Sequence, residues 1–393
     1  MPGFARAAPI VDENNVCTQN PPMRRYYDRN RRTLHAARDA GYNPLFENAM
    51  KYLVAVMSLF LLPLLALSQA DPSMRASNFL PKPPTFRVGR ANTMSIVARD
   101  PNTRELGVAV ESHYFSVGPV VPWAEAGVGA VATQANADPS YGPLGLALMK
   151  SGKTASETLR SLMAGDADVA SRQIAMIDAA GNVDAYTGTK PTPAAGHKIG
   201  TDYSVQGNTM ATPKVWEAMA VAFEHSSGDL ADRMLAALDA GQNAGGDIRG
   251  EQTAALLVVS GHPTGQPWKD RLFDLRVEDS PHPITELKRL VRLRRAYLLV
   301  GQGDELAAKK QWEEAIQKYR SAASLAPEKD EITYGLAVTL FLAGREAESL
   351  PIFRQVFREH PQWVEITRRY VTTGDLPNNP DRIKRILDQA LSK

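Results

Sequence analysis

The sequence predicts an α+β domain followed by an all-helical region, and two observations carry this prediction. Short alternating segments come in pairs joined by turn residues, and helical segments are grouped between these pairs. Antiparallel hairpins with segregated helices indicate an α+β architecture rather than a doubly wound parallel sheet. From about Pro283 glycine becomes scarce and long amphipathic segments follow, as expected of paired helices.

Strands are predicted where apolar and polar residues alternate between turn signals. Thr93–Arg99 alternates, turn residues follow, and Glu105–Glu111 alternates again, which predicts a hairpin. Thr253–Val259 is continuously apolar, as expected of a strand that is covered on both faces. The other predicted strands are Gly127–Thr133, the hairpin of Arg172–Asp178 with Val183–Thr187, and Arg271–Val277.

Helices are predicted where apolar residues recur at helical spacing. Thr154 and Glu157 fit a capping box, and Pro213 after Thr212 fits a proline in the first turn. The predicted helices are Gly142–Lys150, Thr154–Ala164, Pro213–Glu224 and Asp229–Gln242.

The composition excludes several classes of protein. Hydrophobic residues make up 44% of the 393 residues and charged residues 22%, which is typical of a folded globular chain. The chain has 45 Lys and Arg against 43 Asp and Glu, so charge gives no case for a nucleic-acid partner. Cys17 is the one cysteine, which excludes an internal disulfide and a cysteine-based zinc site.

The N-terminal region predicts export. The apolar run Leu53–Leu67 follows a lysine and ends before Ser68-Gln69-Ala70, so residues 50–70 are predicted to be a signal peptide that directs the chain to the periplasm or the exterior. An uncleaved membrane anchor is the alternative. Residues 1–49 are interpreted as a non-native or disordered extension, with a genuine cytoplasmic segment as the alternative, and the proline-containing residues 71–92 as a linker.

The helical region predicts tetratricopeptide-like repeats. Pro327 and Pro361 are 34 residues apart, which is the period of these repeats. At that offset small and large residues coincide, with Gly303 matching Ala337 and Tyr319 matching Phe353. Such repeats recruit protein partners, and the uncapped end of a two-copy array is a surface that a second copy of the chain would cover. A helical extension without repeat ancestry is the alternative.

Candidate site residues cluster at the ends of predicted strands. The clusters are residues 111–118, residues 133–138 with Tyr141, residues 206–208 and residues 245–253. Asn and Gln supply amide donors for an oxyanion, and Asp247 with Arg249 would form an orienting pair. The alternative is that these are ordinary turn and cap residues. Because the sequence has no H-E-x-x-H, no G-x-S-x-G and no phosphate-binding loop, neither a metal nor a cofactor is expected.

Residues 93–259 resemble the family catalogued as domain of unknown function 1028. The matching stretches include TMSIVARDP, ELGVAVESHYFSVGPVVPWAEAGVGAVATQA, NADPSYGPLGLALMKSG, VQGNTMA and AGGDIRGEQTAALLVV. The family is grouped with the N-terminal-nucleophile hydrolases, so the resemblance implies a four-layer αββα sandwich. We place this domain at residues 93–282 and the helical domain at residues 283–393.

The resemblance also implies roles for individual residues. Thr93 would be the nucleophile, with its free α-amine as the base. Gly207 and Asn208 would supply the oxyanion hole, and Asp247 and Arg249 would orient the nucleophile or hold a charged substrate end. The residues expected to contact substrate are Ser112, His113, Gln134, Tyr141 and Gln206.

The sequence therefore supports two alternative functions. The first is an exported amidohydrolase that acts on a small amide or peptide. It requires a second cleavage, because Asp71–Asn92 separates the predicted signal cleavage from Thr93. The second is a catalytically inactive exported binding or scaffold protein, associated with the cell wall by analogy. In that case Thr93 is a β-branched residue that begins a strand, with Ser95 and Val97 on its face.

Overall fold

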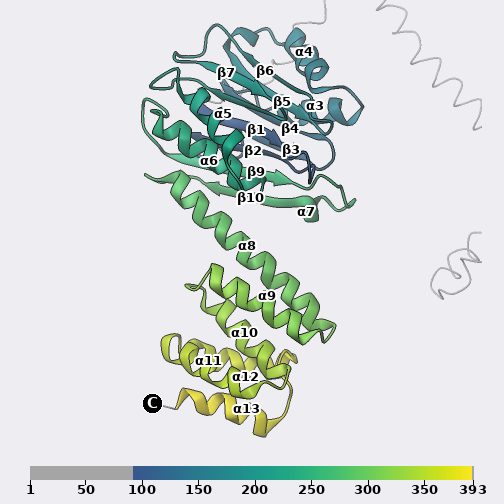
Figure 1. The fold of residues 1–393 in the computed structure, drawn as a ribbon, viewed down its shortest axis with the longest axis vertical. Helices are drawn as coiled ribbons and strands as arrows, with labels where there is room; N and C mark the ends of the chain where they lie inside the picture. The colour runs from purple at the N-terminus through teal and green to yellow at the C-terminus, as the bar shows by residue number, and fades with distance from the viewer. Residues whose placement is uncertain (1–91, 392–393) are drawn as a thin grey trace, which may run out of the picture. The chain divides into compact units, whose positions relative to one another are not determined.

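The computed structural model describes residues 92–391, and the predictions for residues 1–91 lie outside this range. Its first part holds two antiparallel sheets (Figure 1). The six-stranded sheet has the order β10-β9-β2-β1-β8-β7 and the four-stranded sheet the order β3-β4-β5-β6. The strands are β1 (Thr93–Arg99), β2 (Leu106–Ser112), β3 (Pro122–Glu125), β4 (Gly129–Ala135), β5 (Arg172–Asp178), β6 (Val183–Thr187), β7 (Gly196–Gly200), β8 (Tyr203–Gly207), β9 (Thr253–Val259) and β10 (Arg271–Val277).

The two sheets pack face to face, and helices cover their outer faces. The apolar layer between the sheets includes Val97, Val108 and Val110 from the larger sheet and Ala130 and Ala132 from the smaller one. The helices α5 (Val215–His225) and α6 (Leu230–Asn243) cover the larger sheet, and α3 (Tyr141–Lys150) and α4 (Ala155–Gly165) cover the smaller one (Figure 1).

Side-chain alternation along β1 positions the candidate site. Val97 faces the layer between the sheets, whereas Met94 and Ile96 face α5 and α6. Because alternate residues share a face, Thr93 and Ser95 lie on the same side as Val97. The two sheets therefore enclose polar side chains at the start of β1.

Most predicted elements have the expected position. The bounds of β1, β5, β6, β9 and β10 agree with the prediction, and every residue of β9 is buried. The capping box of Thr154 and Glu157 is present at the start of α4. The short strands β3, β7 and β8 were not predicted, because proline or glycine at their ends shortens the alternating pattern.

The prediction that Pro213 lies in the first turn of a helix is wrong. The helix α5 begins at Val215, with Lys214 as its N-cap. The backbone N–H of Lys214 donates instead to the Thr212 hydroxyl, so residues 212–214 form a turn before the helix.

The C-terminal part of the chain is all-helical. Pro283 begins α8, as predicted, and the described helices are α8 (Pro283–Ala308), α9 (Trp312–Leu325), α10 (Asp330–Leu342), α11 (Glu346–Glu359), α12 (Gln362–Thr373) and α13 (Pro380–Leu387). A Cβ atom at Gly303 would lie 2.9 Å from the Tyr319 ring, so the small and large positions interlock as the repeat pattern predicts. No helix within residues 92–391 combines the length and apolarity that crossing a membrane requires.

The boundary between the two predicted domains lies inside a packed core. Ile284, Leu287 and Val291 of α8 belong to the same apolar cluster as β9, β10 and α6. Leu293 and Ala296, further along the same helix, pack with α9 instead. One continuous helix therefore contributes to both cores.

Candidate functional site

The ends of four neighbouring strands meet in the six-stranded sheet. Thr93 begins β1 and is paired with Ser112 at the end of β2, while Ser112 is paired with Thr253 at the start of β9. The strand β8 ends at Gly207 opposite Met94, and Asn208 follows. The antiparallel register thus brings together most of the polar residues that the sequence places at strand ends.

The side chains of Thr93 and Ser112 lie next to the peptide bond that precedes β1. Both side chains are fully buried. The Thr93 hydroxyl donates to Ser112 Oγ at 3.2 Å, and the Ser112 hydroxyl donates to the carbonyl oxygen of Asn92 at 2.6 Å. The guanidinium of Arg249 donates to the same carbonyl oxygen at 3.1 Å. Two donors therefore converge on the carbonyl of the Asn92–Thr93 bond.

Asp247 holds Arg249 in place. The Arg249 Nη2 and Nε atoms lie 2.6 Å and 3.0 Å from the two carboxylate oxygens, and the Arg249 backbone N–H donates to the same carboxylate at 2.9 Å. The Asp247 side chain is fully buried, whereas that of Arg249 is one-third exposed. This two-point ion pair fixes the guanidinium plane, so Asp247 and Arg249 are paired as the sequence predicts.

Side-chain amides form a hydrogen-bond network next to Thr93. Gln134 on β4 donates to the Thr93 carbonyl at 3.2 Å and accepts from Ser95 at 2.6 Å, so it ties the two sheets together. Gln206 donates to Ser95 at 2.6 Å. Gln173 on β5 accepts from Gln134 at 2.7 Å and from Asn208 at 2.9 Å. All of these side chains are buried, and their mutual bonds make the network rigid.

Gly207 and Asn208 do not point their donors at the Asn92 carbonyl. Gly207 is paired with Met94 on one side and Gly196 on the other, and its carbonyl accepts from Gln173 at 2.8 Å. The Asn208 amide nitrogen is directed to Gln173 and, at 3.5 Å, to the Thr93 carbonyl. In this structure the donors on the Asn92 carbonyl come from Ser112 and Arg249 instead.

Tyr141 and His113 lie outside the network. Tyr141 begins α3 on the outer face of the smaller sheet, and its hydroxyl donates to Asp166 at 3.0 Å. Burial and that carboxylate raise the pKa of Tyr141, so it acts as a fixed donor. His113 follows β2, and within residues 92–391 its buried Nδ1 has no hydrogen-bond partner. It lies near Gly250, at the border of the site.

The sequence analysis placed Glu111 in a candidate cluster but gave it no role, and it did not place Ser95 or Gln173 in the site. Polar side chains on otherwise apolar, alternating strands were the signal for Ser95 and Gln173. Glu111 is fully buried at the end of β2, and burial, followed by Asp247 and Glu251, raises its pKa well above the ordinary value. Within residues 92–391 no cluster of His, Cys, Asp or Glu is arranged to hold a metal ion.

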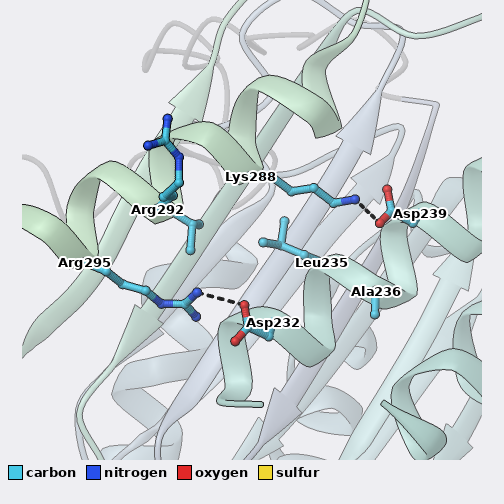
Figure 2. A pocket seen from close by; sticks show the side chains of 8 residues that line it. Asp232, Leu235, Ala236, Asp239, Lys288, Arg292 and Arg295 are labelled. Atoms are coloured by element: carbon cyan, nitrogen blue, oxygen red, sulfur yellow. Dashed lines mark hydrogen bonds and ion pairs between the residues drawn. The ribbon is translucent and has the colours of Figure 1, made fainter. Parts of the chain in front are cut away.

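A separate cavity of about 320 Å³ lies between α6 and α8 (Figure 2). Leu235, Ala236 and Val291 supply its apolar lining. Its charged side chains are engaged, since Lys288 pairs with Asp239, Arg295 with Asp232, and Arg292 with Glu328. These pairs join α8 to α6 and to Glu328, which lies between α9 and α10.

Comparisons with known proteins match two separate parts of the chain. The model of a family of unknown function, DUF1028, matches residues 93–287, and a tetratricopeptide repeat model matches residues 306–367. A search of curated proteins gives no match. A crystal structure of a DUF1028 protein from Silicibacter pomeroyi is 31% identical, with a TM-score of 0.46, and the alignment covers 51% of this chain and 84% of that one.

Proposed function

Since this chain belongs to the DUF1028 family, we propose that residues 93–287 form an amide hydrolase whose nucleophile is Thr93. The proposed enzyme has the N-terminal-nucleophile type of sandwich and acts on a small amide or peptide. The two helix-covered sheets support this fold, and the position of Thr93 at the start of β1 supports its role. The reaction as proposed requires neither a metal nor a cofactor.

The observation that carries the proposal is the pair of hydrogen bonds to the Asn92 carbonyl oxygen. Ser112 and Arg249 donate to it at 2.6 Å and 3.1 Å. Donors at such distances stabilise the negative charge that develops when a carbonyl is attacked. The Thr93 hydroxyl is bonded to the same Ser112. Nucleophile, proton acceptor and carbonyl donors therefore surround a single peptide bond.

This arrangement supports self-cleavage between Asn92 and Thr93. Thr93 Oγ bonds to the Asn92 carbonyl carbon while its proton passes to Ser112, which gives its own proton to the carbonyl oxygen. Collapse of this intermediate breaks the C–N bond, re-forms the carbonyl as an ester, and leaves the proton on the nitrogen. Water then hydrolyses the ester to the Asn92 carboxylate and the free Thr93 hydroxyl.

After cleavage the same groups would serve a substrate. The α-amine of Thr93 has an ordinary pKa near 8, so it can take the hydroxyl proton at neutral pH. Ser112 and Arg249 would then meet the substrate carbonyl in the place that the Asn92 carbonyl vacates. Asp247 keeps Arg249 oriented through both stages.

The test is intact mass with N-terminal sequencing of the purified full-length chain and of Thr93→Ala. We expect the wild-type chain to begin at Thr93 and the variant to retain the bond. Thr93→Ser, which keeps a hydroxyl, should be cleaved. Equal processing of the wild type and Thr93→Ala by a host protease, or no processing at all, would sink the proposal.

The helical region supports a second proposed activity, the binding of a protein partner. The repeat match at residues 306–367 is the observation that favours it, because tetratricopeptide repeats generally mediate protein–protein interaction. Export through a signal peptide at residues 50–70 stays a proposal. An inactive scaffold at the cell wall is the alternative function if Thr93 is never released.

A further inference from the structure

Glu111 has a buried carboxyl group that forms no hydrogen bond with the described part of the chain. Its side chain is fully buried, and neither carboxyl oxygen has a partner within residues 92–391. Burying an ionised carboxylate without a partner costs more free energy than the net free energy of folding, so such a group stays neutral. An unpaired carboxyl next to a candidate site calls for a physical explanation.

The neighbours of Glu111 within the sheet are apolar, whereas two acidic residues lie near the ends of the strands. Its register partners are Met94 on β1 and Ala254 on β9, both in the core beneath α6. The charged groups that act on it are Asp247 and Glu251, which disfavour its ionisation, and Arg249, which favours it. Arg249 already has two bonds to Asp247. Among residues 92–391, no cationic group forms a hydrogen bond to the Glu111 carboxyl.

Cleavage before Thr93 would create a cation at the start of β1, where the Thr93 N–H donates to the Asn208 carbonyl at 3.3 Å in the uncut chain. Thr93 is paired with Ser112, so Glu111 lies one register position from Thr93 on the neighbouring strand. Arg249 reaches the carbonyl of the Asn92–Thr93 peptide group and also acts on the Glu111 carboxyl. When that peptide bond is broken, its nitrogen becomes an α-amine that can carry a positive charge.

We propose that Glu111 is the counter-charge of the Thr93 α-ammonium group, neutral in the uncut chain and ionised after cleavage; this rests on the self-cleavage proposed above. The Thr93 Oγ–C bond forms and the C–N bond breaks. The hydroxyl proton of Thr93 and the carboxyl proton of Glu111 both end on the nitrogen. The products are an ester, an α-ammonium group and the Glu111 carboxylate, so protons and charge balance. Glu111 is thus a positioning residue that sets the charge state of the proposed base.

Infrared spectroscopy of the full-length chain tests the change in charge. In uncut Thr93→Ala at neutral pH we expect the carbonyl band of a neutral, buried carboxylic acid, which the added substitution Glu111→Gln removes. In the cleaved wild type the band should be gone. The exposed substitution Glu217→Gln serves as the matched control and should leave the band in Thr93→Ala. The main comparison does not require any Glu111 variant to fold.

The reactivity of the α-amine provides the second measurement. Without its counter-charge the ammonium group loses its proton more readily, so Glu111→Gln should speed acylation of Thr93 about tenfold below the amine pKa, which is one pKa unit. A purely structural role for Glu111 would leave this pH profile unchanged.

The outcomes separate this inference from the proposed function. An intact mass that shows no cleavage overturns both. Cleavage with a persistent acid band in the wild type, with no such band in Thr93→Ala, or with unchanged amine reactivity in Glu111→Gln overturns the role of Glu111 alone.

Discussion

Ser112 donates a 2.6 Å hydrogen bond to the carbonyl oxygen of Asn92 from the neighbouring strand. The same hydroxyl accepts from Thr93 at 3.2 Å. A single side chain therefore links the proposed nucleophile to the carbonyl that it would attack. The pairing of Thr93 with Ser112 at the ends of β1 and β2 is what makes this link.

Replacing Ser112 with alanine should slow self-cleavage about 100-fold or more, the usual cost of losing one oxyanion donor. The loss is expected because the proton relay disappears with the donor. A mass-spectrometric time course of the full-length chain measures it. Ser349→Ala removes a buried hydroxyl in the helical region, which donates to the Ala337 carbonyl, and should leave the rate unchanged. Wild-type kinetics in Ser112→Ala would exclude the relay.

Arg249→Lys should slow cleavage although it keeps the positive charge. A lysine cannot hold both Asp247 oxygens and the Asn92 carbonyl, since only the planar guanidinium offers that fork. Arg249→Ala also leaves the buried Asp247 carboxylate without its ion-pair partner, and should lower the free energy of unfolding by about 2 kcal/mol, less than for a fully buried pair because Arg249 is partly exposed.

Arg99→Ala is the matched control for this pair. Arg99 binds Asp202 at 2.9 Å at the other end of β1, and both side chains are mostly buried. The control should cost stability and leave the cleavage rate of the remaining folded protein unchanged. If both variants slow cleavage to the same extent, the effect of Arg249 comes from stability alone.

Glu111→Gln should make stability less dependent on pH. The pKa of Glu111 is raised in the folded protein, chiefly by burial. Its neutral form therefore favours the fold at low pH, and this contribution is lost as the pH rises through the raised pKa. In the uncut Thr93→Ala background, urea unfolding should show the advantage of Glu111→Gln growing as the pH rises. An advantage that is constant across that range would contradict the shift.

The sequence predicted where four residues lie better than it predicted which residues they contact. The four are Thr93, Ser112, Asp247 and Arg249. Alternation along β1 and β2 places Thr93 and Ser112 at strand ends, and the spacing of two residues brings Asp247 to Arg249. The bond from Gln134 to Thr93 crosses between sheets, so it depends on how the sheets pack. Local patterns do not report such packing, which is why Gln173 was missed and why the bond of Tyr141 to Asp166 was not foreseen.

A chain that ends at Arg295 should keep its self-cleavage within about twofold of the wild-type rate and lose repeat-mediated binding. It retains Ile284, Leu287 and Val291, which pack in the core of the first domain. It also retains the pairs of Arg295 with Asp229 and Asp232. Cleavage followed by mass spectrometry and capture of a partner on immobilised protein measure the two activities separately.

A chain that ends at His282 provides the contrast. It removes three buried apolar side chains from that core, each worth roughly 1.5–3 kcal/mol of burial, so the first domain should lose most of its stability. Thermal unfolding of the two truncated chains distinguishes them. If the chain ending at Arg295 is stably folded and yet uncleaved, the repeats themselves take part in cleavage, and the separation of the two activities is wrong.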